Sequence, residues 1–145
     1  MKRLLLLVLL SLPLLACANS AEQLEVFDLV PLQLGNTKIQ VQLADTPEKR
    51  SQGLMFQQSA DPGMLLLYKE PTAVSLWMAN TAIPLDVAYI GPDWTIAELI
   101  TLEPFDKTPV PAAKPVIAAL EMPRGWFAQH GISVGQKVTL EKDKN

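Results

Sequence analysis

Three charged residues have types and positions that could support chemistry: Asp86, Glu121 and Arg50. Asp86 opens an otherwise apolar run, where a lone carboxylate is costly unless it is hydrogen-bonded. We expect Asp86 to accept backbone N–H groups from the preceding Asn80-Thr81 segment, which would be a structural role. The alternative role is a general base or a ligand contact in a cleft.

Three partners are open to Arg50. It could pair with Glu121, pair with Asp86, or bind a ligand carboxylate through its planar fork of N–H donors. Trp77 could belong to the core or form an aromatic platform. Asn80 and Thr81 are natural turn residues, because their side chains bond to nearby backbone groups. The candidate residues for binding a ligand or partner are therefore Arg50, Trp77, Asn80, Thr81, Asp86 and Glu121.

A soft metal site is a further hypothesis, because thioether sulfurs suit Cu(I). The residues that could contribute are Met55, Met64, Met78 and Met122, with Trp77 and His130. Methionine is also a common filler of hydrophobic cores, and these four lie in separate segments. We therefore predict no metal site and no cofactor.

The sequence carries no strong catalytic or cofactor motif. It has no Gly-x-Ser-x-Gly, phosphate loop, dinucleotide fingerprint or paired-histidine zinc motif. Its single histidine excludes any site that needs two. Whether the protein is an enzyme stays open at this point.

Residues 1–16 resemble a secretory signal peptide. A positive start precedes an apolar run from Leu4 to Leu15, which is too short for a spanning helix of about 20 residues. Leu14-Leu15-Ala16-Cys17 resembles a bacterial lipobox, so we predict a lipidated Cys17 and a tether over residues 17–23. Ordinary signal peptidase cleavage after Ala18 is the alternative.

Cysteine usage and charge bear on the location of the protein. Cys17 is the only cysteine, and lipidation would remove a free thiol that is a liability in an oxidising compartment. We predict a periplasm-facing lipoprotein anchored in the outer membrane, with a soluble periplasmic protein as the alternative. Loss of Lys2 and Arg3 leaves ten of the 12 basic residues against all 15 acidic ones, a net charge of −5. That charge argues against nucleic acid as a partner and leaves the anchor as the only membrane contact.

Residues 24–142 suit a single β-rich domain. Thr37 to Leu43 alternates strictly between polar and apolar residues, and the preceding Gly35-Asn36 is a hairpin signal. Further strands are expected within residues 24–34, 64–68, 73–78, 85–90, 95–102, 116–122 and 135–141. About eight short strands in all predict a mainly β barrel or sandwich with one or two short helices.

Two connecting segments have clear local signals. A short helix should begin at Pro47, with Thr46 as its cap, and end at Gly53. Four prolines between Pro104 and Pro115 predict a surface excursion that is neither strand nor helix.

Several segments together resemble one family. The main one runs Trp77-Met78-Ala79-Asn80-Thr81-Ala82-Ile83-Pro84-Leu85-Asp86, and the others are Glu48 to Met55, Gly63-Met64-Leu65, Leu120-Glu121 and Gly131 to Gly135. Their order and spacing over residues 37–141 are similar to the uncharacterised family called domain of unknown function 192. The resemblance implies a small β-rich domain, often exported, with no settled activity. The sequence departs from the family pattern between Pro104 and Pro115, where similar proteins tend to carry a tyrosine or serine.

These observations predict a binding module of the cell envelope whose partner is an unknown small ligand or an envelope protein. One alternative is a hydrolase or transferase that uses Asp86 and Arg50, and another is a structural accessory of an envelope complex. A deep pocket containing Asp86, Asn80 and Arg50 would favour an enzyme. A flat apolar patch including Trp94 or Trp126 would favour a protein partner.

Overall fold

The computed structural model describes residues 24–141. The predicted signal peptide at residues 1–16, the tether at residues 17–23 and the last residue of the predicted domain lie outside the described residues. The described part contains nine strands and two short helices, so the mainly β prediction is confirmed. The strands are β1 (Asp28–Leu34), β2 (Thr37–Ala44), β3 (Met64–Thr72), β4 (Ser75–Leu76), β5 (Leu85–Ile90), β6 (Ile96–Leu102), β7 (Val110–Pro111), β8 (Val116–Pro123) and β9 (Val138–Leu140), and the helices are α1 (Pro47–Gln52) and α2 (Trp126–Gln129).

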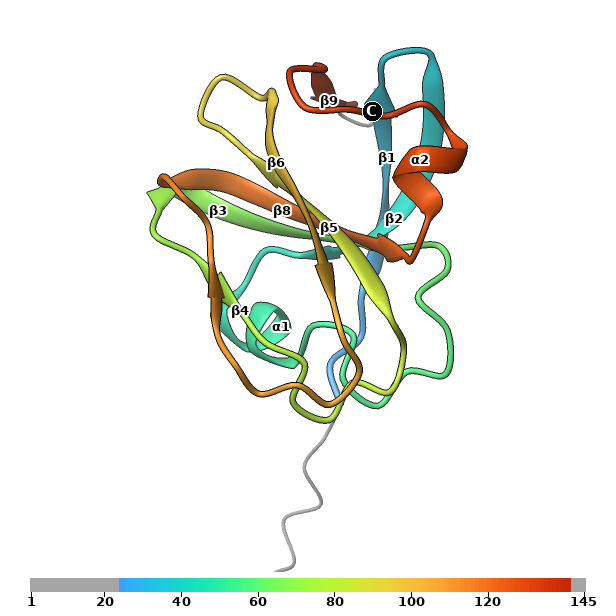
Figure 1. Ribbon diagram of the computed structural model, residues 1–145, viewed down its shortest axis with the longest axis vertical. Coiled ribbons are helices and arrows are strands. Elements are labelled where there is room, and N and C mark those ends of the chain that lie inside the picture. The colour runs from blue at the N-terminus through green and yellow to red at the C-terminus, as the bar shows by residue number, and fades with distance from the viewer. Residues whose placement is uncertain (1–23, 142–145) are drawn as a thin grey trace, which may run out of the picture.

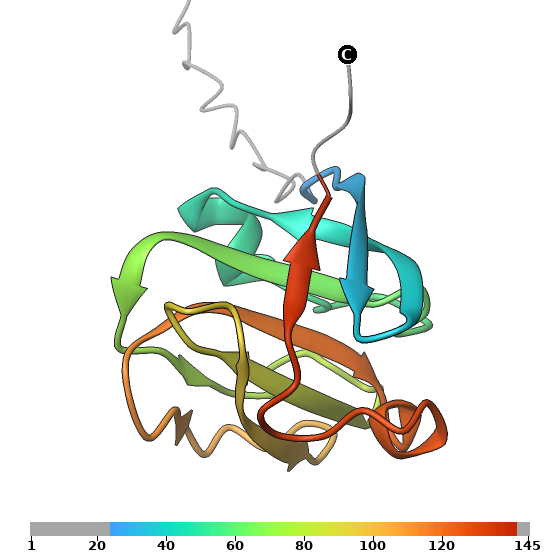
Figure 2. The ribbon, with the colours of Figure 1, turned by 90° about the horizontal axis from the view of Figure 1, so that it is seen from above.

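Seven strands form one curled sheet in the order β6-β5-β8-β3-β2-β1-β9 (Figure 1). Strands β2 and β3 are parallel, whereas the other neighbours in the sheet are antiparallel. The two edges of the sheet meet where Thr95, just before β6, bridges to Lys137, just before β9. Figure 2 shows the resulting curl, with β9 lying across the opening of the sheet. The two remaining strands, β4 and β7, pair with each other outside this sheet.

The β1–β2 hairpin and helix α1 form as their local sequences predict. Leu34 pairs with Thr37 across the Gly35-Asn36 turn, and Gly35 has the positive φ of 55° that a tight turn of this kind requires. Helix α1 begins at Pro47, and the Thr46 hydroxyl caps it by accepting the Lys49 N–H at 3.2 Å.

One expectation about the elements is wrong. The proline-rich segment between Pro104 and Pro115 contains a short strand, β7, which pairs with β4 through Ser75↔Pro111 and Leu76↔Val110. The Tyr89 hydroxyl donates to the Val110 carbonyl at 2.7 Å and fastens this strand to the main sheet.

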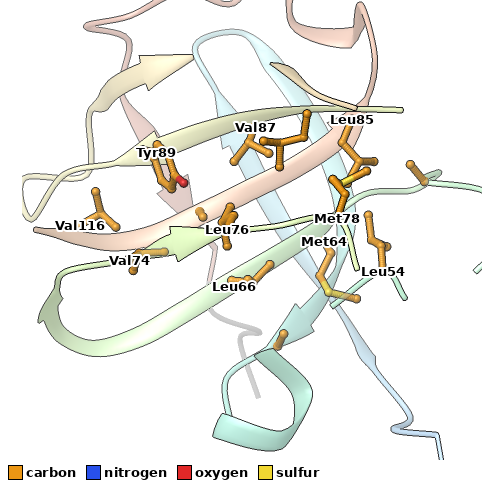
Figure 3. Close-up of a cluster of buried hydrophobic side chains, with 14 residues drawn as sticks. Leu54, Met64, Leu66, Val74, Leu76, Met78, Leu85, Val87, Tyr89 and Val116 are labelled. Carbon is orange, nitrogen blue, oxygen red and sulfur yellow. The ribbon is translucent and has the colours of Figure 1, made fainter. Parts of the chain in front are cut away.

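Alternate residues of the central strands face opposite sides of the sheet and build two separate cores. One core contains residues from every strand of the curled sheet and therefore lies inside the curl; Leu65, Leu120 and Met122 belong to it. The other core lies on the outer side, beneath β4 and α1, and Figure 3 shows its members. They include Leu54, Met64, Leu66, Val74, Leu76, Met78, Leu85, Val87, Tyr89 and Val116.

Candidate functional site

A pocket of about 280 Å³ opens on the outer side of the sheet, and we call it the outer pocket. Its walls come from α1 and the residues after it, from β3 and β8, and from β4 with the elbow, which we define as residues 77–84. Its lining residues are Pro47, Arg50, Ser51, Gln52, Gly53, Leu54, Met55, Leu66, Tyr68, Ser75, Leu76, Trp77, Met78, Thr81, Leu85 and Glu121. The pocket therefore joins four of the six predicted site residues: Arg50, Trp77, Thr81 and Glu121.

Glu121 is the buried acid of the outer pocket. Its neighbours on β8, Leu120 and Met122, face the inner core, so strand alternation turns the Glu121 side chain to the outer side. The residue is only 6% exposed, and its Oε2 atom is a buried oxygen with no hydrogen-bond partner among residues 24–141. Burial raises the pKa of Glu121 to about 7, because the charged carboxylate is poorly solvated there.

The Arg50 side chain is held in the pocket wall by hydrogen bonds to backbone carbonyls of other residues. One of its terminal nitrogens, Nη1, donates to the carbonyls of Asp45 and Leu67, each at 2.8 Å. Its guanidinium carbon lies 4.7 Å from the centre of the Tyr68 ring, a cation–π contact. The ion pairs found within residues 24–141 are Lys38–Glu141, Lys49–Asp28 and Arg124–Glu103. The predicted pairs of Arg50 with Glu121 or Asp86 are therefore not formed.

Tyr68 belongs to the outer pocket and was missed by sequence reasoning. Burial raises the pKa of its hydroxyl, although the positive charge of Arg50 opposes that rise. Met64, Leu66 and Tyr68 alternate along β3 on the outer side, which the sequence pattern predicts for a strand. The sequence does not show that β3 lies beside β8, the pairing that places Tyr68 and Glu121 in the lining of one pocket.

The elbow is fixed through backbone hydrogen bonds to two distant loops. The Asn80 carbonyl accepts the Phe56 N–H, and the Thr81 carbonyl accepts the Phe105 N–H, both at 3.0 Å. The Thr81 hydroxyl donates to the Ala79 carbonyl at 3.2 Å, which fits the predicted turn role. Thr81 is buried in the pocket wall, whereas Asn80 is exposed and has a positive φ of 56°. Asn80 is therefore a turn residue outside the pocket lining.

Trp77 is not a core residue. It lies between the buried Leu76 and Met78, contributes to the pocket lining and is 56% exposed. Of the two roles considered for Trp77, the aromatic platform is the one that this exposure allows.

The expected partners of Asp86 are wrong. Its side chain accepts the Thr101 hydroxyl at 2.8 Å and the Gly125 N–H at 2.7 Å, and the elbow contributes neither bond. Leu85 and Val87 belong to the outer core, so alternation along β5 turns Asp86 to the opposite face of the sheet from the outer pocket. Asp86 and Arg50, the two residues of the hydrolase or transferase alternative, therefore do not share a site in the described fold.

The methionines do not converge on one point. Met64 and Met78 lie in the outer core, whereas Met122 lies in the inner core. His130 is the residue that caps the C-terminal end of α2, and its ring stacks on Trp126 with centroids 4.1 Å apart. Within residues 24–141, no group of three or more His, Cys, Asp or Glu side chains is arranged to hold a metal ion.

Neither helix of the described part is long and apolar enough to cross a membrane.

No curated protein matches the chain. Two solved structures are similar over most of their length. A protein of unknown function from Novosphingobium aromaticivorans is 36% identical, with 77% of this chain and 84% of that chain covered and a TM-score of 0.70. A Sinorhizobium meliloti protein described as a "putative transcription regulator" is 30% identical, with 80% and 97% covered and a TM-score of 0.75.

The family comparison covers nearly the whole described domain. Residues 30–140 match the family described as "Uncharacterized ACR, COG1430", also called domain of unknown function 192. The predicted resemblance is therefore confirmed over the hairpin, the elbow and the strand that carries Glu121. The chain belongs to the family of domain of unknown function 192.

Proposed function

We propose that this protein is a lipid-anchored binding module of the cell envelope, and that it binds a small ligand in the outer pocket. The single observation that carries the binding role is Glu121. A buried carboxylate oxygen such as Glu121 Oε2, which has no hydrogen-bond partner among residues 24–141, costs free energy, and a polar cavity is the place where a ligand can offset that cost. A cavity of about 280 Å³ suits a small molecule.

The position of the outer pocket agrees with an anchored domain. Phe56 and Leu24 are 54% exposed, and both line a second hollow that shares Ser51, Gln52 and Met55 with the outer pocket. The start of β1, α1 and the elbow lie at one end of the molecule (Figure 1). An anchor on Cys17, only seven residues before Leu24, would hold this end near the membrane.

We propose no nucleic-acid role, although one similar structure is described as a "putative transcription regulator". The predicted mature chain has a net charge of −5, and an acidic protein lacks the attraction to phosphate that such binding uses.

The binding role is tested by recording backbone amide NMR spectra of the mature chain, with Cys17→Ser, against a library of small-molecule fragments. We expect the fragments that bind to shift the signals of Gly53, Tyr68, Thr81 and Glu121. Shifts confined to the shallow hollow around Trp94 and Lys137, or no binding at all, would contradict the proposal.

Two tryptophan substitutions provide a matched comparison. Ser51→Trp adds bulk at the exposed wall of the outer pocket and should weaken fragment binding. Ser133→Trp adds the same bulk at an exposed position in the loop after α2, outside the outer pocket, and should leave binding unchanged. Equal effects of the two substitutions would count against the outer pocket.

A further inference from the structure

We propose that the outer pocket selects a small zwitterion, with its ammonium group against the Glu121 carboxylate and its anionic group at Arg50. This inference rests on the proposed function, because it names the ligand class of that same pocket. It depends on the two charged side chains of the lining, which come from helix α1 and strand β8.

The Glu121 carboxylate can accept hydrogen bonds from a ligand. The Oε2 atom has no partner among residues 24–141, and no residue of that range donates to it. The ideal Cβ position on Gly53 is 3.8 Å from Oε2, so the carboxylate lies close to the α1 wall, where the glycine leaves room. A primary ammonium group brings three donors and a positive charge, which is the most favourable complement to a buried carboxylate.

The Arg50 guanidinium can bind an anionic group of the ligand. Its Nη1 atom is fixed by two backbone carbonyls, which orient the guanidinium without neutralising it. Within the described residues no carboxylate oxygen lies within 4.0 Å of its nitrogens. A carboxylate or phosphate group can pair with the N–H groups of the fork that these carbonyls do not use.

The two side chains together disfavour ligands that carry only one charge. A simple amine would meet the Glu121 carboxylate but also the positive field of Arg50. A simple anion would meet Arg50 but would be repelled by ionised Glu121. Arg50 and Glu121 form no ion pair, so their charged atoms lie more than 4.0 Å apart, and the ligand that we propose carries its two charges on different atoms of a short chain. The rest of the lining includes Leu54, Leu66, Leu76 and Met78, so the outer pocket offers apolar surface to a short carbon chain.

The test is isothermal titration calorimetry with the mature chain carrying Cys17→Ser. The probes are a series of ω-amino acids of increasing length, namely glycine, β-alanine, 4-aminobutanoate and 5-aminopentanoate, compared with butylamine and butanoate. We expect one length of the series to bind best, and butylamine and butanoate to bind at least about tenfold more weakly than that zwitterion.

Substitutions assign the two ends of the ligand. Glu121→Gln keeps the shape of the side chain but removes its charge, and Arg50→Gln removes the cation. We expect each to weaken binding of the best zwitterion by at least about tenfold. Asp86→Asn changes a carboxylate on the opposite face of the sheet and should leave the affinity within about twofold.

Each other outcome overturns the inference. Butylamine or butanoate binding as tightly as the zwitterions would show that only one charge is recognised. Equal losses in Asp86→Asn and Glu121→Gln would show that binding lies elsewhere. If none of the amino acids binds while library fragments still shift the signals of the pocket, the zwitterion inference falls and the proposed function stands. If the fragments also fail, both fall.

Discussion

At the scale of single residues, two carboxylates in similar apolar strands have opposite surroundings. Asp86 is satisfied by Thr101 and Gly125, whereas the Oε2 atom of Glu121 has no partner within the described residues. Val87 pairs with Glu121 across β5 and β8, so Asp86, one residue earlier, faces the other side of the sheet. The two acids are neighbours in the ladder but belong to different sites.

Asp86 should act as a structural residue that is independent of the elbow. Asp86→Asn weakens two hydrogen bonds to a charged acceptor and should cost about 1–3 kcal/mol of unfolding free energy. In a double-mutant cycle by denaturant unfolding, its coupling to Thr101→Val should exceed about 0.5 kcal/mol. Its coupling to Asn80→Gly should stay below that value, because no network joins the two sites.

The reverse pattern of couplings would contradict this assignment. Strong coupling to Asn80 would show that Asp86 belongs to a hydrogen-bond network with the elbow, as the sequence predicted.

Local sequence predicted the types of the site residues better than their partners. The lone acids, the arginine and the exposed tryptophan stand out by residue type, and four of the six candidates line one pocket. The partner of Asp86 was wrong because Gly125 lies 39 residues away and donates through its backbone, which no residue type reveals. Tyr68 was missed because its place in the pocket depends on which strands are neighbours.

At the scale of elements, the connection into β3 depends on one glycine. Gly63 has a φ of 99°, a conformation that side chains rarely adopt. A Cβ atom there would overlap the Met122 sulfur and would lie 3.0 Å from the Glu121 carbonyl oxygen. This close approach lets β3 pair with the strand that carries Glu121.

Gly63→Ala should therefore destabilise the protein by about 3 kcal/mol or more, through backbone strain and overpacking together. Gly131→Ala is the matched control, because Gly131 also has a positive φ, 65°, but no atom lies within 4 Å of its Cβ position. The control should cost only about 1–2 kcal/mol. Thermal or denaturant unfolding measures both, and equal losses would show that the close approach to β8 is unimportant.

The sequence predicted most elements because their signals are local. Alternation marked β2, a turn signal marked its hairpin, and a capping pattern marked α1. Strand β7 carried no such signal, since its two residues include a proline. It exists because β4 supplies backbone partners and Tyr89 binds its carbonyl, and both are tertiary contacts.

At the scale of the whole molecule, the curl of the sheet joins distant parts of the chain. The parallel pairing of β2 with β3 and the bridge from Thr95 to Lys137 bring the two edges of the sheet together. Regular turn spacing was enough to predict a barrel or sandwich. The strand order could not be predicted, because several orders would bury the same apolar faces.

The location of the whole molecule should depend on Cys17. Metabolic labelling with a fatty acid should mark the wild-type protein, and Cys17→Ser should release it from the membrane fraction, because Cys17 is the only thiol that can carry the anchor. An unmodified mature N-terminus at Asn19, seen by mass spectrometry, would contradict the lipid anchor and favour a soluble protein.

The central claim is that Glu121 is buried in the outer pocket and that its Oε2 atom has no hydrogen-bond partner among residues 24–141. It is tested by the unfolding free energy of wild type and Glu121→Gln between about pH 4 and pH 8, measured without ligand. Arg50 lines the same pocket, and the tyrosines that face Glu121 are Tyr68 and Tyr89. Burial raises the pKa of both tyrosines, so neither hydroxyl ionises in this range.

Burial raises the pKa of Glu121 from 4.5 to about 7, so the folded protein holds its proton more tightly than the unfolded chain. This contribution to stability is fully present below pH 4.5 and is lost as the pH rises through about 7. Relative to Glu121→Gln, the wild type should lose on the order of 3 kcal/mol across that window. A difference between the two proteins that does not change with pH would show that Glu121 ionises as it does in water, and would contradict the account.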